Sequence, residues 1–387
     1  MNLDGARRRL GFLMREVSGS LGDLGTLFPL LAGMVLAGSA SMSGTLIWFG
    51  FFTITTGIVF GIPLAVQPMK VIASLSITQK LPPETLVAAG IILGVSILLL
   101  SQTRVLKMLQ ERLPKAVIVG IQVTLGLQLV NSALTMMAGK PLFGLDSVSV
   151  GVVSLAIILL SLKFRSFPAA LLLTVMGLAM TVVAYPQILH NVTPELSLPP
   201  LVVPSYENFV KGAELAVAQI PLTVTNSLLA TVALGQRFFP RRSPTIRSVA
   251  LNLSAMNLVA PLFGGVPMCH GAGGMASWHR FGARTAASML MFGTALTVAG
   301  LLFGNFALTL MQAFPLTILA AMLLSIGVQF TLMIRESLNA SDLMITAATV
   351  AVSILFSILL GLAAGFLCSV ILKKVYRGEG YPKPASV

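Results

Sequence analysis

The chain has 387 residues, of which 56% are hydrophobic and only 10% are charged, and its mean hydropathy is +0.93. Too few polar side chains are present to cover a soluble globule, so the composition predicts a polytopic helical membrane protein. The net charge of +13 would suggest nucleic acid in a soluble protein, but the basic residues lie at the ends of apolar segments. We therefore expect a lipid bilayer around this chain and no nucleic-acid partner.

Hydropathy divides the chain into two sets of seven segments, and the third segment of each set has half the usual length. The first set lies at residues 21–40, 45–62, 67–79, 84–103, 115–134, 147–162 and 167–188. The second set lies at residues 210–234, 246–263, 267–278, 284–303, 313–333 and 342–373, the last of which is too long for one crossing and suits two short ones. The pattern predicts an all-α membrane protein with fourteen segments, of which the third and tenth are half-helices.

Landmarks in the two sets recur at a spacing of about 200 residues, as in Pro63 with Pro267, Glu84 with Gly282, and Lys115 with Pro315. An odd number of crossings per repeat inverts the second repeat, which is typical of secondary transporters whose broken helices meet at the midplane. The predicted parts are a cytoplasmic N-terminus (1–20), a first repeat (21–190), an extracytoplasmic linker (191–209), a second repeat (210–374) and a cytoplasmic tail (375–387).

The basic residues give an independent test of this topology. With the N-terminus in the cytoplasm, Lys80, Lys140 and Lys211 fall outside, Lys70 falls within the membrane, and the rest of the 25 Lys and Arg residues fall inside. A miscounted helix in the middle of the chain would scramble this pattern. We expect a multi-pass protein of the cell inner (plasma) membrane with both termini in the cytoplasm.

Both half-length segments open on glycine- and proline-rich runs that suit an anion. Pro267 bars a regular helix at the start of the later run, and Gly271, Gly273 and Gly274 let backbone N–H groups come close to a ligand. A helix that starts just afterwards offers free N–H groups and a partial positive charge. The earlier run, residues 60–70, opens similarly, so the two runs together predict an anion site.

Four motifs occur in order along the chain: Gly22-Asp-Leu-Gly-Thr26 with Pro29, Val66-Gln-Pro-Met-Lys70, Gln219-Ile-Pro-Leu222 with Asn226-Ser227, and Pro267-Met-Cys-His-Gly-Ala-Gly-Gly274. Together they resemble the molybdate transporter family of the sulfate permease superfamily, over nearly the whole chain. The resemblance implies the seven-plus-seven inverted-repeat fold, with a core domain of segments 1–4 and 8–11 and a gate domain of segments 5–7 and 12–14. Because the sequence ends about a dozen residues after its last apolar segment, we expect no C-terminal cytoplasmic regulatory domain.

The resemblance implies a secondary active transporter that imports molybdate, a tetrahedral oxyanion, by alternating access, with no cofactor and no metal. Substrate contacts are expected from the start of each half-length segment and from the eighth segment. The residues are Gln67, Pro68, Met69 and Lys70 in the first run, Gln219 and Asn226 on the eighth segment, and Cys269, His270, Gly271, Ala272, Gly273 and Gly274 in the later run. No ATP-binding motif of the Gly-x-x-x-x-Gly-Lys type is present, so uptake against a negative-inside potential needs a coupled cation. A proton is the expected ion, with Asp23 and His270 as candidate carriers.

Three polar residues of the first repeat each have two or more interpretations. Gln67 either hydrogen-bonds an oxyanion or caps exposed backbone. Lys70 is the one lysine within the apolar region, and it either attracts a divalent oxyanion or ties helices together through a carbonyl or carboxylate. Asp23 pairs with Lys70, binds the coupling proton, or caps a helix N-terminus, and Thr26 is a further coupling or structural candidate.

The second repeat leaves similar alternatives. Gln219, Thr223 and Asn226 share one helical face, either as substrate contacts or as hydrogen bonds between packed helices. Cys269 and His270 could suggest a metal site or an intramembrane enzyme, but adjacent side chains diverge and no acidic partner or second Cys/His pair is near in sequence. We therefore expect His270 to bond near the anion and the protein not to be an enzyme.

Other anions fit the same architecture. A sulfate permease or an exchanger of other anions is the main alternative, because molybdate and sulfate share charge and shape and differ mainly in size. Tungstate is a further expected ligand. A purely structural protein is disfavoured by paired broken helices and buried polar groups. Homodimerisation is an expectation from relatives alone, since no residue pattern here indicates it.

Overall fold

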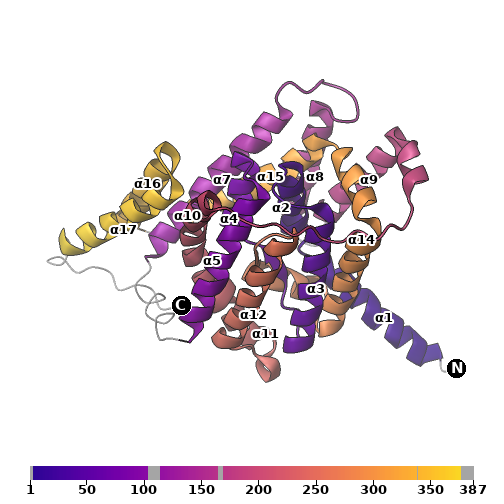
Figure 1. Cartoon of the computed structure of the whole chain (residues 1–387), viewed down its shortest axis with the longest axis horizontal. Coiled ribbons are helices and arrows are strands. Elements are labelled where there is room, and N and C mark those ends of the chain that lie inside the picture. Colours follow the sequence, from indigo (N-terminus) through magenta and orange to yellow (C-terminus); the bar gives the residue numbers. More distant parts are fainter. Residues whose placement is uncertain (1–2, 103–113, 164–168, 338, 376–387) are drawn as a thin grey trace.

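The computed structural model describes residues 3–102, 114–163, 169–337 and 339–375, which form one bundle of helices (Figure 1). The first repeat contains α1 (Leu3–Ser20), α2 (Leu24–Leu36), α3 (Met42–Phe60), β1 (Val66–Pro68), α4 (Lys70–Gln79), α5 (Pro83–Ser101), α7 (Lys115–Met137), α8 (Val148–Lys163), α9 (Ala169–Ala184) and the short η1 (Pro186–Asn191).

The second repeat follows the same plan. It contains α10 (Tyr206–Leu222), the π-helix η2 (Thr223–Ala230), α11 (Thr231–Phe238), η3 (Pro240–Arg242), α12 (Ile246–Val259), η4 (Pro261–Phe263), β2 (Met268–His270), α13 (Ala272–Phe281), α14 (Ala286–Gln312), α15 (Leu316–Thr331), η5 (Leu332–Glu336), α16 (Ala340–Leu355) and α17 (Ile358–Val375). The long apolar stretch at the end of the chain is two helices, as the sequence predicts.

The helices follow the order of the predicted segments, although α2 is shorter than the predicted 21–40 and α14 extends to Gln312, beyond the predicted end at residue 303. Seven spans in the described residues are long and apolar enough to cross a membrane: α3, α5, α7, the continuous run α10 to α11, α12 with η4, α14, and α15 with η5. The described part of α1 and α2 would form one further span, bent by 49°, and α8, α9, α16 and α17 are shorter apolar helices. With the half-helices α4 and α13, these elements account for the fourteen segments and confirm the seven-plus-seven fold.

The two half-helices meet through a pair of short antiparallel strands. β1 and β2 lie opposite each other with Val66 across from His270 and Pro68 across from Met268. The N–H of Met69 extends the pairing by donating to the carbonyl of Pro267 at 3.0 Å. Proline keeps both runs out of the helical conformation, and an extended run needs a partner for its backbone groups inside an apolar bundle. Each strand therefore satisfies the other, and α4 and α13 begin almost at the same place.

Close glycine contacts join the repeats in one group of helices. A Cβ added to Gly50 on α3 would lie 2.5 Å from the carbonyl oxygen of Gly293 on α14. On α5, a Cβ added to Gly90 would lie 2.9 Å from the carbonyl oxygen of Asn257 on α12. The first contact joins the second segment to the eleventh, and the second contact joins the fourth segment to the ninth. The inverted repeat relates these two contacts to each other. Small residues allow such approach in membrane helices, where dispersion contacts drive association.

A second group of helices packs in the same way. α7 lies against α15, where a Cβ added to Gly126 would lie 2.6 Å from the carbonyl oxygen of Gly327. α8 also packs on α15, and α16 packs on α7 and α17. Contacts between the two groups are fewer and involve α2, α4 and α10 on one side and α7, α9, α15 and α17 on the other. The boundary between the groups is therefore the more loosely packed part of the bundle.

The linker between the repeats crosses the middle of α14 (Figure 1). Phe303 departs from helical geometry and kinks α14, which frees carbonyl groups of the preceding turn. The N–H groups of Glu195 and Ser197 donate to the carbonyls of Leu302 and Leu301 at 2.9 and 2.8 Å. Extended chain and kinked helix thus satisfy each other's backbone groups.

Helix α1 projects from the bundle and is held at its C-terminal end (Figure 1). Glu16 is buried, and its carboxylate accepts the N–H groups of Arg284 at 3.0 Å and Thr285 at 3.3 Å. A carboxylate at the start of α14 is favoured by the helix dipole. This contact ties the N-terminal helix to the second repeat.

Candidate anion site

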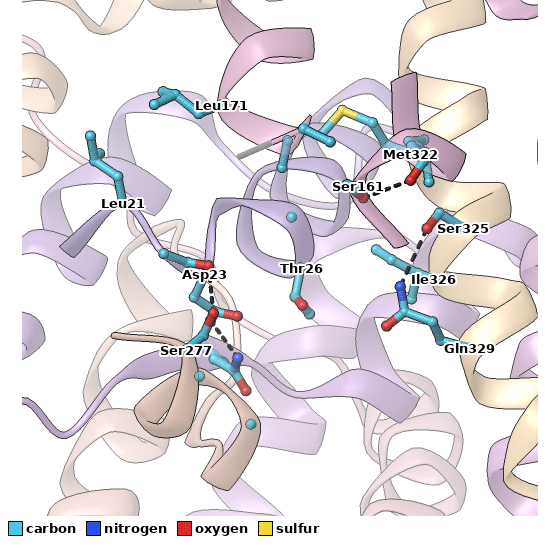
Figure 2. A pocket seen from close by; sticks show the side chains of 18 of the residues that line it. Leu21, Asp23, Thr26, Ser161, Leu171, Ser277, Met322, Ser325, Ile326 and Gln329 are labelled. Carbon is cyan, nitrogen blue, oxygen red and sulfur yellow. Dashed lines mark hydrogen bonds between the residues drawn. The ribbon is translucent and has the colours of Figure 1, made fainter. Parts of the chain in front are cut away.

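A cavity of about 660 Å³ lies at the boundary between the two groups of helices. One wall is formed by α2, β1, α4 and α13, and the other by α8, α9 and α15. Figure 2 shows Asp23, Thr26 and Ser277 on the first wall, facing Ser325 and Gln329 on α15. Along α13 the lining continues from Gly273 in the first turn to Arg280 near the C-terminal end. The cavity therefore joins the strand pair to that end of α13.

The N-terminus of α13 forms part of this cavity. The N-cap residue of α13 is Gly271, which has no side chain to cap the first N–H groups of the helix. Gly273 is exposed, and Gly273 and Gly274 line the cavity. A half-helix that ends inside the bundle keeps its dipole field in a region of low dielectric constant. Its first turn can hold an anion through backbone donors.

Gln67 and Asp23 lie across the first turn of α13. The Nε2 of Gln67 donates a short hydrogen bond to Oδ2 of Asp23, while its Oε1 is buried without a partner among the described residues. A Cβ added to Gly271 would lie 1.7 Å from Gln67 Oε1, and one added to Gly274 would lie 2.6 Å from Gln67 Nε2 and 2.8 Å from Asp23 Oδ2. Two of the three glycines of this motif therefore make room for the amide and the carboxylate.

The position of Asp23 decides between the interpretations given above. It is the N-cap residue of α2, but its side chain accepts no capping hydrogen bond. The helix-cap interpretation is therefore wrong, because the carboxylate turns toward Gln67 instead of the first turn of its own helix. Asp23 is 8% exposed and lines the cavity together with Thr26, one turn further along α2. It forms no ion pair with Lys70 within 4 Å in the described structure.

The N-terminus of α4 differs from that of α13 because protein groups already occupy it. Oε1 of Gln219 accepts the N–H of Val71 at 2.9 Å, and Nε2 of Gln219 donates to Thr223 Oγ1 at 3.0 Å. Both side chains are buried and lie outside the cavity lining. Gln219 therefore serves as a cap between helices, reached from the π-helical region near Pro221, where the regular ladder is interrupted.

Replacing Gln219 by alanine is expected to lower the free energy of unfolding by about 1–3 kcal/mol, because it leaves the buried N–H of Val71 without a partner. Thermal unfolding in detergent measures this loss. Gln329→Ala is the matched control, since this amide is exposed and bonds only to Ser325 at 3.3 Å. Equal unfolding temperatures for the two variants would contradict the capping role.

Lys70 is the first residue of α4 and contributes its side chain to the cavity. Its Nζ lies 5.6 Å from the ring centroid of Phe330 on α15, on the opposite wall. A cation over an aromatic face is partly compensated without losing its charge. Lys70 thus brings positive charge to the boundary between the two groups of helices, next to the Asp23 and Gln67 pair.

His270 and Cys269 belong to β2, and neither residue lines the cavity. The two ring nitrogens of His270 lie 3.3 Å from the carbonyl of Ala65 and 3.0 Å from Oδ1 of Asn252. Cys269 Sγ lies 3.7 Å from the carbonyl oxygen of Pro68. The expectation that His270 adds a bond to the anion is wrong for this structure, because its ring is already bonded within the protein. Among the described residues no group of three His, Cys, Asp or Glu side chains is placed to hold a metal.

A buried asparagine fixes the strand that precedes α13. Asn257 on α12 donates from Nδ2 to the carbonyls of Leu253 at 2.8 Å and Met268 at 2.7 Å, and its Oδ1 accepts the N–H of Met268 at 3.0 Å. Sequence reasoning missed this residue because an asparagine in an apolar segment carries no sign of its partner. Its contacts show that β2 is held from behind as well as by β1.

The structure separates the predicted site residues into two sets. Those that line the cavity are Asp23, Thr26, Gln67, Lys70, Gly273 and Gly274. Those outside the lining are Pro68, Met69, Gln219, Thr223, Asn226, Cys269, His270, Gly271 and Ala272. Most of the second set position the first, by strand pairing, by capping α4, or, for Gly271, by leaving space for Gln67. The site is therefore built mainly on β1 and the first turns of α2, α4 and α13.

Sequence reasoning missed the polar residues that α8, α15 and the C-terminal half of α13 contribute to the cavity lining. These are Ser161, Ser277, Arg280, Ser325 and Gln329. Ser277 Oγ also donates to the carbonyl of Gly22 at 2.7 Å, which joins α13 to the turn before α2. The spacing of Ser325 and Gln329, one helical turn apart in an apolar segment, is a signal that could have been used.

The fold and the cavity define a multi-pass membrane transporter with inverted repeats, in which a site lies where two half-helices meet. Residues 15–129 and 211–330 match the family model described as "Molybdate transporter of MFS superfamily". The chain belongs to this molybdate transporter family. Its seven-plus-seven arrangement differs from the two six-helix halves that characterise major facilitator transporters.

Similar proteins cover nearly the whole chain. Molybdate transporter 2 of Arabidopsis thaliana is 30% identical over 96% of this chain and 91% of its own length. Molybdate transporter 1 of Chlamydomonas reinhardtii is 28% identical over 83% of this chain and 84% of its own length. These matches extend across both repeats.

Solved structures share the fold at low sequence identity. The transmembrane domain of the cyanobacterial bicarbonate transporter BicA superposes with a TM-score of 0.65 at 17% identity, covering 92% of this chain and 97% of that one. Murine Slc26a9, an anion transporter solved in an inward-facing state, gives a TM-score of 0.69 at 13% identity, covering 95% of this chain and 69% of that one. Both matches show that the chain shares the fold of these two transporters.

Proposed function

We propose that this protein is a secondary active transporter that imports molybdate across the cell inner (plasma) membrane, with both termini in the cytoplasm. The observation that carries the proposal is the first turn of α13, where Gly273 and Gly274 line a cavity between the two groups of helices, beside the side chains of Gln67 and Asp23. Molybdate is the ligand named for the family and for its Arabidopsis and Chlamydomonas relatives. Its tetrahedral oxygens suit backbone N–H groups and an amide donor.

The charges of the cavity support an anionic substrate. Lys70 and Arg280 line it, and Asp23 is the one carboxylate in the lining among the described residues. The walls from α8, α9 and α15 contribute serine, glutamine and apolar side chains. A dianion bound near Gly273 would lie at the positive end of the α13 helix dipole, in a cavity whose lining also carries the cationic side chains of Lys70 and Arg280.

Alternating access would come from movement of one group of helices against the other. In this proposal α2 to α5 and α10 to α14 form the core domain, and α7 to α9 and α15 to α17 form the gate domain. The closer packing within each group and the cavity at their boundary support this division. The lining reaches Arg280, which the positive-inside arrangement assigns to the cytoplasm, so the proposed state is inward-facing.

Uptake of an anion against a negative-inside potential needs a coupled cation, and a proton is the proposed one. Asp23 is the favoured carrier, because it lines the cavity and touches Gln67. His270 is less suited, since its ring is engaged with Ala65 and Asn252 away from the cavity. A homodimer, expected from relatives, remains part of the proposal.

The test is calorimetric titration of purified protein with molybdate, tungstate and sulfate at fixed pH. We expect molybdate and tungstate to bind more tightly than sulfate, and Gln67→Ala to weaken binding by at least about tenfold, because it removes an amide from the site. Gln187→Ala is the control, since this amide is exposed on η1 and lies outside the cavity. Equal or tighter sulfate binding would identify a sulfate-type carrier, and no binding of any of the three would refute the proposed function.

A further inference from the structure

Helix α1 carries an apolar stripe that the described bundle leaves exposed, formed by Leu10, Leu13, Met14 and Val17. These residues follow the spacing i, i+3, i+4 and i+7, so they share one face of the helix. Their exposed fractions range from 43% for Val17 to 64% for Met14. An apolar stripe of this kind, followed along the chain by the first membrane segment, indicates contact with something other than water.

The other side of α1 packs on the bundle at the C-terminal end of the helix. At about 3.6 residues per turn, Glu16 and Gly19 lie across the helix from the apolar stripe. The Glu16 carboxylate accepts two N–H groups at the start of α14, and a Cβ added to Gly19 would lie 2.1 Å from the backbone nitrogen of Ala283. Phe12 is also exposed, but it belongs to the side of Glu16 and Gly19. The contacts with the bundle therefore turn the apolar stripe outward.

The charges of α1 are mainly basic. Arginines occupy residues 7–9, in the turn before the apolar stripe, and Arg15 is exposed on the side of the helix between the stripe and Gly19. The acidic residues of the helix are Asp4 and Glu16, and Glu16 is buried against α14. Arginines beside an apolar face are typical of helices that lie in the headgroup region of a membrane and attract anionic lipids.

The direction of α1 differs from that of the first membrane crossing. The chain bends by 49° between the described part of α1 and α2. Figure 1 shows α1 running outward from the edge of the bundle. A crossing that included α1 would carry the exposed Arg15 into hydrocarbon, which is costly, whereas a helix in the interface keeps its arginines among the headgroups.

We propose that α1 is a membrane-surface helix that binds the headgroups of anionic phospholipids. The apolar stripe enters the boundary between headgroups and acyl chains, and the arginines contact the lipid phosphates. The positive-inside arrangement assigns this contact to the cytoplasmic leaflet. Ser18 and Leu21 line the cavity, so the lipid-bound helix leads directly to the edge of the candidate anion site. The inference does not depend on which anion the cavity holds.

The test is spin labelling of the full chain in lipid vesicles. Leu13→Cys and Met14→Cys each place a nitroxide on the apolar stripe. Gly11→Cys places one on the side that bears Arg15, where an added Cβ meets no heavy atom within 4 Å. A helix that crosses the membrane would hold these neighbouring positions at similar depths. A helix in the interface holds them at different depths, because they lie on different faces.

The labelled chains also carry Cys368→Ser, while the buried Cys269 stays in place. The chain with Cys368→Ser alone is the labelling blank. Electron paramagnetic resonance measures collisions of each nitroxide with oxygen, which concentrates in the bilayer, and with a nickel complex that stays in water. Unfolding temperatures equal to that of the blank show that the labelled chains are folded.

In vesicles of phosphatidylcholine mixed with phosphatidylglycerol, the labels on the apolar stripe should collide mainly with oxygen and the Gly11 label mainly with nickel. In pure phosphatidylcholine the stripe labels should gain access to nickel. Arg15→Gln in the mixed vesicles should lower the ratio of inserted to free α1 by about fivefold, which is the effect of one basic residue near an anionic surface. Arg335→Gln is the matched control, because Arg335 is exposed on η5, and it should leave the ratio unchanged.

Four results would overturn the inference. High nickel access at all three labels in the mixed vesicles would place α1 in water, and equal shielding of all three from nickel would make α1 part of the first crossing. Shielding of the stripe labels from both reagents would identify a protein as the partner, such as a second copy of this chain. Identical results in the two kinds of vesicle would exclude recognition of anionic lipid. No measurement here uses molybdate, so the proposed transport function stands or fails separately.

Discussion

Gly271→Ala is expected to weaken molybdate binding by at least about tenfold. The added Cβ would lie 1.7 Å from Oε1 and 2.5 Å from Cδ of Gln67, so the amide must leave its position over the first turn of α13. Backbone strain is not the cause, because Gly271 has φ −119° and ψ 123°, which alanine adopts readily. The substitution therefore tests the space that the glycine leaves for the amide, with the backbone N–H retained. Calorimetric titration with molybdate measures the effect.

Gly11→Ala on α1, outside the cavity lining, is the control for a glycine-to-alanine change in a helix. A Cβ at this position meets no heavy atom within 4 Å, and alanine in a helix is favoured over glycine by up to about 1 kcal/mol. We expect the control to bind molybdate within about threefold of the wild type and to unfold at the same or a higher temperature. Equal binding by both variants would show that the position of the Gln67 amide does not matter for the anion.

Gly50→Val is expected to give the largest loss of stability, lowering the free energy of unfolding by more than about 3 kcal/mol. A Cβ at Gly50 would lie 2.2 Å from Thr297 Oγ1, 2.5 Å from the carbonyl oxygen of Gly293 and 2.6 Å from the N–H nitrogen of Thr297. Two of these atoms belong to the backbone of α14, so the helices must separate to admit the side chain. The α3 and α14 contact crosses the repeats, and its loss should reduce the yield of folded protein as well as its unfolding temperature.

Ile58→Ala provides the comparison on the same helix. Ile58 is 67% exposed and lies on the surface of α3 that faces away from the bundle. A substitution there should change stability by no more than about 0.5 kcal/mol. Thermal unfolding of both variants in the same detergent decides the matter, and similar unfolding temperatures would mean that the close packing of α3 on α14 contributes little.

The segments of this chain could be predicted from its sequence because each depends on local composition. The half-length runs at residues 67–79 and 267–278 are visible as short apolar stretches behind Pro63 and Pro267, and α4 and α13 confirm them. The division of residues 342–373 into α16 and α17 was also predicted from length alone. A period of hydrophobicity and a spacing of charges are properties of neighbouring residues, so they can be read without a fold.

The partners of the polar residues could not be predicted in this way. Gln219 and Gln67 both lie within two residues of a proline in the apolar region, yet one caps α4 from behind and the other lies over the first turn of α13. His270 stands next to the glycine motif but bonds away from the cavity to Asn252. Side-chain direction depends on which helices pack on each side, and that packing joins residues about 150 to 250 positions apart.

The sequence by itself determined the number of segments, their inversion, the two broken helices and the family. Hydropathy and the positions of the charges are sufficient for the segments and their inversion, because the bilayer acts on every segment in the same way, and the ordered motifs indicate the family. Only the tertiary structure decided that β1 pairs with β2, that Asp23 bonds to Gln67 instead of capping α2, and that α15 supplies the opposite wall. These contacts depend on the close approach of the two repeats, and no local pattern of residues specifies which polar groups then meet.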